Sequence, residues 1–402
     1  MQYDFLMKQS NELMDEVVNL RREFHRYPEI GHKEVKTTEL ILKKLEEYGV
    51  DEIQRPLKTG AVALIHGTGT KGAGSCVALR ADIDALPVTE ETGLPYASQV
   101  PGMMHACGHD MHAAMQLGVA KLLCENREHF GGTVKLIFQP SEDTLPGGAK
   151  EMVEKGVMEA PHVDAIFGLH VMPSQQEERG KISFHEGPLT TSVDLFDVTV
   201  KGKGGHGSTP HLTKDPILAA CQMVTLLQQI PARYVNPLET VIFPVCSIHS
   251  GDAPNVIPDE ARFSGIARAY VPEVRRQVAE QVMEIAKGVE ALSGTQVHVH
   301  HYEGYPACYN DPSLTRNTMA AMKETLGEEH VVYENNPASF SEDFSYFTEM
   351  TGTPGTYMFL FGGYEGEEMV ALHNPKLAMK EDVMPYGMTA MAAAAMNYLN
   401  DH

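Results

Sequence analysis

The chain has 402 residues, of which 43% are hydrophobic and 21% are charged, a composition typical of a globular protein with room for two domains. Its 32 Lys and Arg residues against 54 Asp and Glu residues give a formal net charge of −22. The sequence contains no cluster of Lys and Arg residues that would form a basic surface, so nucleic acids and anionic membranes are poor candidate partners. No segment approaches the roughly 18 apolar residues of a membrane span.

The six cysteines are widely spaced and form no Cys-x-x-Cys pair, which is not typical of a disulfide framework in a chain of this length. The N-terminal segment lacks a charged region followed by an apolar one, so we expect no signal peptide. Both features favour a cytoplasmic location.

The first half of the chain predicts helices that alternate with buried strands. Apolar residues recur at helical spacing over residues 11–26 and 33–48, which indicates two amphipathic helices. Short and nearly all-apolar runs follow, typical of strands in a sheet covered on both faces, at 61–65, 76–79, 134–138 and 165–169. Polar residues stand where these strands end. This is the α/β pattern in which functional sites gather at the carboxyl ends of strands.

The pattern of predicted helices and strands changes near residues 186–188. The expected order is strand, helix, two strands, helix and strand, at 194–201, 215–230, 241–247, 261–270, 272–292 and 296–302. This β-α-β-β-α-β order is typical of a small ferredoxin-like domain. Helices are then expected over 311–326 and 380–399, and with them the α/β pattern of the first half of the chain returns. We therefore predict an α/β domain, 1–187 and 304–402, into which an α+β domain, 188–303, is inserted.

One stretch, residues 104–112, concentrates groups that can bind a metal: three histidines, one cysteine and one aspartate. An apolar helical run follows it, so Asp110 is expected to cap the helix N-terminus. Cys107 and His109 would lie at that N-terminus, where the helix dipole favours the metal-binding thiolate. Two residues apart, they can face one pocket. The plainer alternative is a buried free cysteine beside solvated histidines.

Further candidate residues follow other strands or lie near the C-terminus: Asp82 and Asp84, Glu142 and Asp143, His170, and His373. Singly, each is more often a solvated or structural residue, and their shared position at strand ends sets them apart. Together with Cys107 and His109 they offer sulfur, nitrogen and oxygen ligands. Such a mixed set suits Zn²⁺ or another late first-row divalent metal rather than Mg²⁺ or Ca²⁺.

These residues lie in motifs that resemble a known family. In chain order the motifs are RADIDALP, MHACGHDMHAA, FQPSEDTLPGGAKEM, GLHVMP, GKGGHGSTPH, APNVIPDEA, SEDFSYF and HNP. They resemble the amidohydrolase branch of the M20 metallopeptidases, which includes hippurate hydrolases, N-acyl-amino-acid and N-acetyldiaminopimelate deacetylases, and plant auxin-conjugate hydrolases. The resemblance covers nearly the whole chain. It implies a two-metal α/β catalytic domain with an inserted ferredoxin-like lid that often forms dimers.

Carried over by position, the resemblance implies roles for individual residues. Cys107 would be a bridging ligand, with terminal ligands His109, His170 and His373. Glu142 would be the catalytic base, and Asp84 would orient a metal-binding side chain. Asp143 stands where the family usually has a glutamate, and its side chain is about 1.5 Å shorter. Three outcomes stay open for it: binding after a backbone shift, weak binding, or a single-metal site.

The resemblance also implies roles for residues of the inserted domain. His206 would stabilise the oxyanion, in its own subunit or across a dimer interface. Asn255 and Arg268 would hold the carboxylate of the substrate. Five other polar residues in these motifs stay outside the predicted metal set: His105, His112, His211, Glu342 and Asp343.

The resemblance and the ligand set together predict a metal-dependent amidohydrolase acting on N-acyl amino acids such as N-acetyl or benzoyl conjugates. Two divalent metals per chain are expected, Zn²⁺ or Mn²⁺, with Co²⁺ or Ni²⁺ as alternatives. A homodimer or higher homo-oligomer through the lid is expected. Two alternatives are a dipeptidase of the same fold and a small-molecule binding protein whose catalysis is weakened at Asp143.

Overall fold

The computed structural model describes residues 3–366 and 368–402, and the chain divides into two compact units. Unit 1 comprises the chain up to Leu189 together with Tyr309–Pro337 and Asp343–His402. Unit 2 comprises Thr190–Cys308 and Ala338–Glu342. The predicted inserted domain, 188–303, lies in the same region of the chain. The additional segment Ala338–Glu342 was not predicted, because it is short and carries no periodic pattern.

Unit 1 is built on an eight-stranded sheet in the order β1-β2-β4-β3-β5-β17-β6-β16. Its four central strands, β4, β3, β5 and β17, are parallel to one another. They are almost completely buried, as expected for a sheet with covered faces. The strand bounds are β1 Glu52–Gln54, β2 Ala61–His66, β3 Cys76–Asp82, β4 Thr133–Gln139, β5 Ala165–Met172, β6 Ile182–Phe184, β16 Val331–Tyr333 and β17 Gly355–Phe361. A short antiparallel pair joins β7, Gly187–Pro188, to β15, Tyr309–Asn310.

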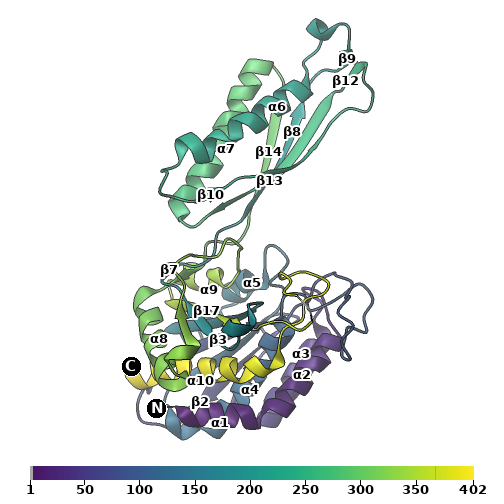
Figure 1. Cartoon of the computed structure of the whole chain (residues 1–402). Helices are drawn as coiled ribbons and strands as arrows, with labels where there is room; N and C mark the ends of the chain where they lie inside the picture. The colour runs from purple at the N-terminus through teal and green to yellow at the C-terminus, as the bar shows by residue number, and fades with distance from the viewer. Residues whose placement is uncertain (1–2, 367) are drawn as a thin grey trace. The chain divides into compact units, whose positions relative to one another are not determined.

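The helices of unit 1 cover this sheet, and α4 and α10 pack on β3 and β5 as well as on each other. In Figure 1, α10, drawn in yellow, runs across the unit close to the N-terminal helices. The bounds are α1 Asp4–Glu12, α2 Met14–Arg26, α3 Val35–Tyr48, α4 His109–Glu125, α5 Gly148–Glu154, α8 Pro312–Leu326, α9 Ser345–Glu349 and α10 Met384–Asp401. The predicted helix over 11–26 was wrong at its start, because α1 ends at Glu12 and α2 is a separate helix.

The main sheet of unit 2 is antiparallel and five-stranded, in the order β10-β13-β8-β14, with β11 also paired to β13. The bounds are β8 Asp194–Lys201, β10 Val241–Ile242, β11 Val245–His249, β13 Glu260–Ala269 and β14 Gln296–Glu303. Helix α6, Pro216–Leu227, begins with Asp215 as its cap, and α7 spans Pro272–Ser293. The predicted β-α-β-β-α-β order is confirmed, and the strand expected over 241–247 is split into β10 and β11 near Pro244.

Shorter elements complete the chain. Strands β9, Gly205–His206, and β12, Val256–Ile257, form a two-stranded ribbon in unit 2. The single-turn helices are η1 Arg127–His129, η2 Gln176–Glu178, η3 Pro210–Leu212, η4 Ile230–Tyr234, η5 Glu328–His330 and η6 Glu381–Val383. Among the helices that the structure describes, none combines the length and the apolar character needed to cross a membrane.

Each unit has its own hydrophobic core. In unit 1 the buried faces of α4 and α10 meet beneath the central strands, and α4 is buried along most of its length. In unit 2 the inward side chains of β8, such as Phe196 and Val198, pack against α6 and α7. Because burial on β8 alternates, the alternating sequence pattern was sufficient to predict this strand.

Close packing of α4 against α10 gives a first prediction. A methyl group on Gly118 of α4 would lie 2.2 Å from the sulfur of Met388 in α10. We expect Gly118→Val to lower the free energy of unfolding by about 1–3 kcal/mol, because the added carbons overpack a dense core. Gly288 of α7 is exposed, and no described atom lies within 4 Å of a methyl placed there. The matched variant Gly288→Val should change stability by no more than about 0.5 kcal/mol.

Urea unfolding followed by circular dichroism measures both variants against the wild type. An equal loss of stability in the two variants would show that the contact between Gly118 and Met388 does not limit the packing of unit 1.

Candidate metal centre

The candidate residues of unit 1 converge because three parallel strands end side by side. Asp82 ends β3, and Asp84 follows it. Glu142 and Asp143 follow β4, and His170 lies near the end of β5. Since β3 is hydrogen-bonded to both β4 and β5 in parallel register, the loops after the three strands lie at one edge of the sheet.

Cys107 and His109 reach the same edge from the N-terminus of α4. The prediction that Asp110 caps this helix was wrong, because the cap is Gly108, in the left-handed conformation (φ 91°), and His109 is the first helical residue. The Asp110 carboxylate instead forms buried ion pairs, 2.8 Å to Arg21 Nε and 2.7 Å to His25 Nδ1. Asp110 therefore ties α4 to α2 and leaves Cys107 and His109 turned toward the strand ends.

The first ligand group comprises Cys107, His109 and His170, all buried, whose ligand atoms lie within 4.8 Å of one another. Cys107 Sγ lies 3.5 Å from His170 Nε2. Each histidine donates its Nδ1–H to a backbone carbonyl, His109 to Asp84 at 3.0 Å and His170 to Val171 at 2.7 Å. This leaves Nε2 of both rings directed into the group, the arrangement typical of metal-bound histidines.

The second group comprises Cys107, Asp143 and His373, again with ligand atoms within 4.8 Å of one another. His373 Nε2 lies 3.3 Å from Asp143 Oδ1, and the His373 amide donates to the Ala106 carbonyl at 2.7 Å. His373 adopts a left-handed backbone conformation (φ 65°), which is uncommon outside glycine. The shorter side chain of Asp143 therefore comes within range of both Cys107 and His373, and Cys107 belongs to both groups.

Two buried atoms in these groups lack a partner. Within residues 3–366 and 368–402, His109 Nε2 and Asp143 Oδ2 are buried and accept or donate no hydrogen bond. Buried polar atoms are normally hydrogen-bonded, so an exception needs an explanation. A cation in each ligand group, one bound by His109 Nε2 and the other by Asp143 Oδ2, provides one, which is why the donor set fits a metal.

The charge of the pocket also favours a cation. Burial by itself would lower the pKa of His109, but the charge of Asp82 and the hydrogen bond to Asp84 raise it well above its usual value. The pKa of His170 is lowered well below the usual value by burial and by the neighbouring His112. His109 is therefore the group that carries positive charge among the carboxylates when no metal is present, and a metal cation can take the place of its proton.

The sequence predicted that the helix N-terminus would favour the thiolate form of Cys107. For the metal-free protein this prediction was wrong. Burial, with a smaller contribution from the charge of Asp143, raises the pKa of this thiol to about 12. The thiol precedes the helix and lies in a closed, acidic pocket, so loss of solvation outweighs the helix dipole. A metal is required to deprotonate it.

Asp84 is the residue that holds the pocket together. Its Oδ1 accepts the Glu142 amide at 2.9 Å, and its Oδ2 accepts the Asp143 amide at 3.1 Å. Its Oδ1 also lies 3.3 Å from His109 Nδ1. Burial would raise the pKa of Asp84, but the hydrogen bonds from His109 and from the Glu142 amide bring it below its usual value. Asp84 stays ionised and orients two residues that follow β4 and the first residue of α4.

Comparison with known proteins identifies the family. The sequence model of peptidase family M20/M25/M40 matches residues 78–397. The chain belongs to this family. It is 39% identical over 395 residues to "Thermostable carboxypeptidase 1" of Saccharolobus solfataricus, covering 97% of each chain. It is 37% identical over 381 residues to "N-acetylcysteine deacetylase" of Bacillus subtilis, covering 94% of this chain and 96% of the relative.

A solved structure of the family has the same fold. The Bacillus subtilis YXEP protein, described as a dinuclear metal-binding peptidase of the M20 family, superposes with a TM-score of 0.81 at 35% identity. The superposition covers 97% of this chain and 99% of that one. The resemblance to M20 enzymes inferred from the motifs is confirmed.

Sequence reasoning missed a buried network behind the ligands of this M20 chain. His112 donates Nδ1–H to Asp82 Oδ1 at 2.6 Å and accepts the Val171 amide on Nε2 at 2.8 Å. Arg80 in turn donates to Asp82 at 2.6 Å and to Asp343 at 2.9 Å. Both nitrogens of His112 are thus used within the protein, so it supports the strand of His170 rather than binding metal. The spacing of His109 and His112, three residues apart on one helix, was the available signal.

The other predicted residues of the M20 site lie in unit 2. His206, in β9, is exposed and hydrogen-bonds Ser208 Oγ through Nδ1 at 2.7 Å. Asn255 lies beside it, because its carbonyl accepts the Gly207 amide at 2.8 Å and the next residue pairs with His206. Arg268 lies near the C-terminal end of β13 and donates to Ser341 Oγ at 2.6 Å. The fold of unit 2 brings His206 and Asn255 together and holds Arg268 apart from them.

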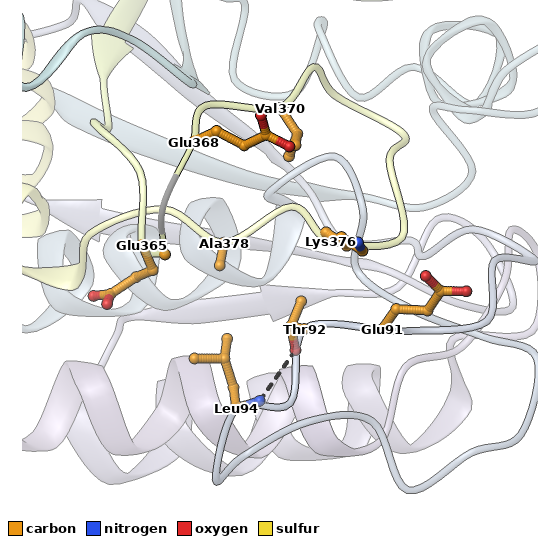
Figure 2. A pocket seen from close by; sticks show the side chains of 9 residues that line it. Glu91, Thr92, Leu94, Glu365, Glu368, Val370, Lys376 and Ala378 are labelled. Carbon is orange, nitrogen blue, oxygen red and sulfur yellow. Dashed lines mark hydrogen bonds between the residues drawn. The ribbon is translucent and has the colours of Figure 1, made fainter.

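A cavity of about 610 Å³ in unit 1 is a separate feature (Figure 2). It lies between the loop of Glu91 and the loop that carries His373, and Figure 2 shows Glu365 and Glu368 among the side chains that line it. Its described lining comprises Glu91, Thr92, Leu94, Glu365, Gly366, Glu368, Val370, Lys376 and Ala378, none of which belongs to the two ligand groups. The ligand groups, not the cavity, therefore locate the candidate centre.

Thiol reactivity tests the state of Cys107 in the metal-free enzyme. We expect Ellman's reagent at pH 8 to label exposed Cys221 and Cys246 within minutes and to leave buried Cys107 unreacted until urea is added. Cys221→Ser and Cys246→Ser serve as controls, since each should remove one fast-reacting thiol. Rapid labelling of Cys107 in the folded metal-free protein would contradict a raised pKa.

Proposed function

We propose that the protein is a metal-dependent amidohydrolase that cleaves the amide bond of N-acyl amino acids. The observation that carries this proposal is the pair of ligand groups that share Cys107, with the carboxylate of Glu142 beside them. Relatives of similar length named as an N-acetylcysteine deacetylase and a putative amidohydrolase support amide hydrolysis as the reaction.

The residues present fit two divalent cations. One would be held by Cys107, His109 and His170, and the other by Cys107, Asp143 and His373, with the thiolate as the bridge. The mixed sulfur, nitrogen and oxygen donors suit Zn²⁺ or Mn²⁺, with Co²⁺ or Ni²⁺ as alternatives. When bound, the metals polarise the scissile carbonyl and lower the pKa of water toward about 7.

Glu142 provides the acid–base chemistry in this proposal. Its side chain is 7% exposed, its amide is fixed by Asp84, and its Oε2 lies 3.9 Å from His109 Nε2. A carboxylate in this position takes a proton from the attacking water and returns it to the nitrogen of the leaving amine. Asp84 keeps the carboxylate aimed at the site by holding the backbone on either side of it.

Residues of unit 2 complete the proposal. His206 donates a hydrogen bond to the developing oxyanion, in its own subunit or in a partner subunit of a homodimer formed through unit 2. Asn255 and Arg268 bind the carboxylate of the substrate. Because unit 2 holds these two residues apart, we propose that they come from different subunits of that homodimer, and that Arg268 exchanges its bond to Ser341 for the carboxylate. We also propose a cytoplasmic location, where the six unpaired cysteines of the described chain would stay reduced.

Peptide hydrolysis is a second candidate function. The relative from Saccharolobus solfataricus, 39% identical, is named a carboxypeptidase, and a peptide bond is also an amide beside a carboxylate in the substrate. A binding protein without turnover is less well supported, because Asp143 comes within ligand range and Glu142 is present.

Metal content and turnover test the proposal together. We expect the wild type to hold two metals per chain and to hydrolyse N-acetyl or N-benzoyl amino acids faster than dipeptides. Glu142→Gln should keep both metals and lose about 10²–10⁴-fold in kcat, because it removes the proton acceptor. Elemental analysis and a ninhydrin assay for released amino acid give the two readouts, with Asp143→Glu measured in parallel.

The outcomes separate the three candidate functions. Faster turnover of dipeptides would favour a peptidase. One metal or none, no turnover in the wild type, and rescue by Asp143→Glu would identify a hydrolase fold that has become a binding protein.

The role of His206 has its own test. We expect His206→Ala to lower kcat by about 10²–10³-fold, the usual effect of losing an oxyanion donor, while metal content stays unchanged. Neighbouring His211→Ala is the matched control, because it is also an exposed histidine of unit 2 and should leave kcat unchanged. Mixing His206→Ala with Glu142→Gln protein would restore activity only if His206 acts across subunits.

A further inference from the structure

The turn that carries Glu142 and Asp143 has an unusual backbone. Ser141, the residue before them, is in the left-handed conformation (φ 57°), which serine rarely adopts. Such a conformation persists only where surrounding contacts enforce it. Asp84 accounts for the next two amides, those of Glu142 and Asp143, but does not contact the amide of Ser141 itself.

A second buried carboxylate holds that amide. Glu34 Oε1 accepts the Ser141 amide at 2.8 Å, and the Glu34 side chain is completely buried. Three successive amides, of residues 141, 142 and 143, therefore donate to two buried carboxylates that come from distant parts of the chain. Burying a carboxylate is costly, so its placement on a strained backbone amide is a specific feature of the fold.

The segment that carries Glu34 is itself anchored at the site. Glu34 immediately precedes α3, and the Glu29 carbonyl a few residues earlier accepts the amide of Ala85 at 2.9 Å. Ala85 follows Asp84. The connection between α2 and α3 thus holds the loop after β3 through Glu29 and the loop after β4 through Glu34, fixing the two loops relative to each other.

We propose that Glu34 is a positioning residue for the metal centre: by holding the Ser141 amide it sets the left-handed turn that aims Glu142 and Asp143 into the site. This inference rests on the proposed roles of Glu142 and Asp143. The pKa of Glu34 is raised to about 7, by burial and by the nearby charge of Asp84, so a neutral side chain with the same carbonyl acceptor can replace it. Glutamine is therefore the conservative variant.

Four proteins test the proposal: the wild type, Glu34→Ala, Glu34→Gln and Leu45→Ala. Leu45 is a fully buried core residue of the same helix α3, so Leu45→Ala is matched for loss of stability without touching the turn. If Glu34→Ala does not fold, Glu34→Asp replaces it, because its carboxylate is about 1.5 Å too short to reach the Ser141 amide.

The first readout is independent of activity. In metal-free protein, we expect amide hydrogen exchange in peptides covering residues 139–145 to be at least 10-fold faster in Glu34→Ala than in the wild type. Exchange in Glu34→Gln should resemble the wild type, and Leu45→Ala should affect α3 more than the turn. Unchanged exchange in Glu34→Ala would overturn the proposal whatever the enzyme does.

The second readout is titration of each metal-free protein with Zn²⁺ alone, followed by kinetics of the loaded enzymes. We expect Glu34→Ala to bind the second Zn²⁺ about 10–100-fold more weakly and to lose kcat rather than raise KM, with recovery in Glu34→Gln. Equal Zn²⁺ affinity and kcat in Glu34→Ala and Leu45→Ala would reduce Glu34 to a structural residue. Two bound Zn²⁺ without turnover in the wild type would reject the proposed function, while the affinities would still decide the role of Glu34.

Discussion

The structure depends on the two hydrogen bonds by which one buried carboxylate, Asp84, holds the backbone of Glu142 and Asp143. Asp84 follows β3, the residues it holds follow β4, and His109 beside it begins α4. The side chain of Asp84 thus fixes the spacing between the candidate base Glu142 and the candidate ligands Asp143 and His109. Because Asp84 is fully buried and ionised, losing any of these contacts would leave a charge without compensation, which makes the arrangement cooperative.

The chemistry of the centre follows from its surplus of negative charge. Asp82, Asp84, Asp143 and Glu142 surround Cys107 and the histidines, and Arg80 is a buried cation on the far side of Asp82. Histidine orientation completes the centre, because Nδ1 of His109 and of His170 is bound to a carbonyl and only Nε2 is offered. A pocket with these properties fits divalent cations. While no cation is bound, it raises the pKa of the Cys107 thiol.

Outside this centre, other parts of the chain act as supports. Asp110 joins α4 to α2 through Arg21 and His25, so the helix that presents His109 cannot shift without breaking buried ion pairs. Arg268 donates a hydrogen bond to Ser341, which lies in the segment Ala338–Glu342 of the same unit, and this gives Arg268 a structural role besides the proposed binding of substrate. Relatives of this chain carry the names of a carboxypeptidase and of an N-acetylcysteine deacetylase, so membership of the M20 family is compatible with both reactions.

The sequence by itself determined the α/β class and the ferredoxin-like order of unit 2, and it offered the candidates from which the two ligand groups are drawn. Strand alternation, helical spacing and Cys107-x-His109 are local patterns, and local patterns are visible in one dimension. Only the tertiary structure decided that Gly108 rather than Asp110 caps α4, that His112 is fully used by Asp82 and Val171, and that Glu34 holds Ser141. These contacts join residues far apart in the chain, and which buried donor meets which acceptor depends on how strands and helices pack, not on spacing along the sequence.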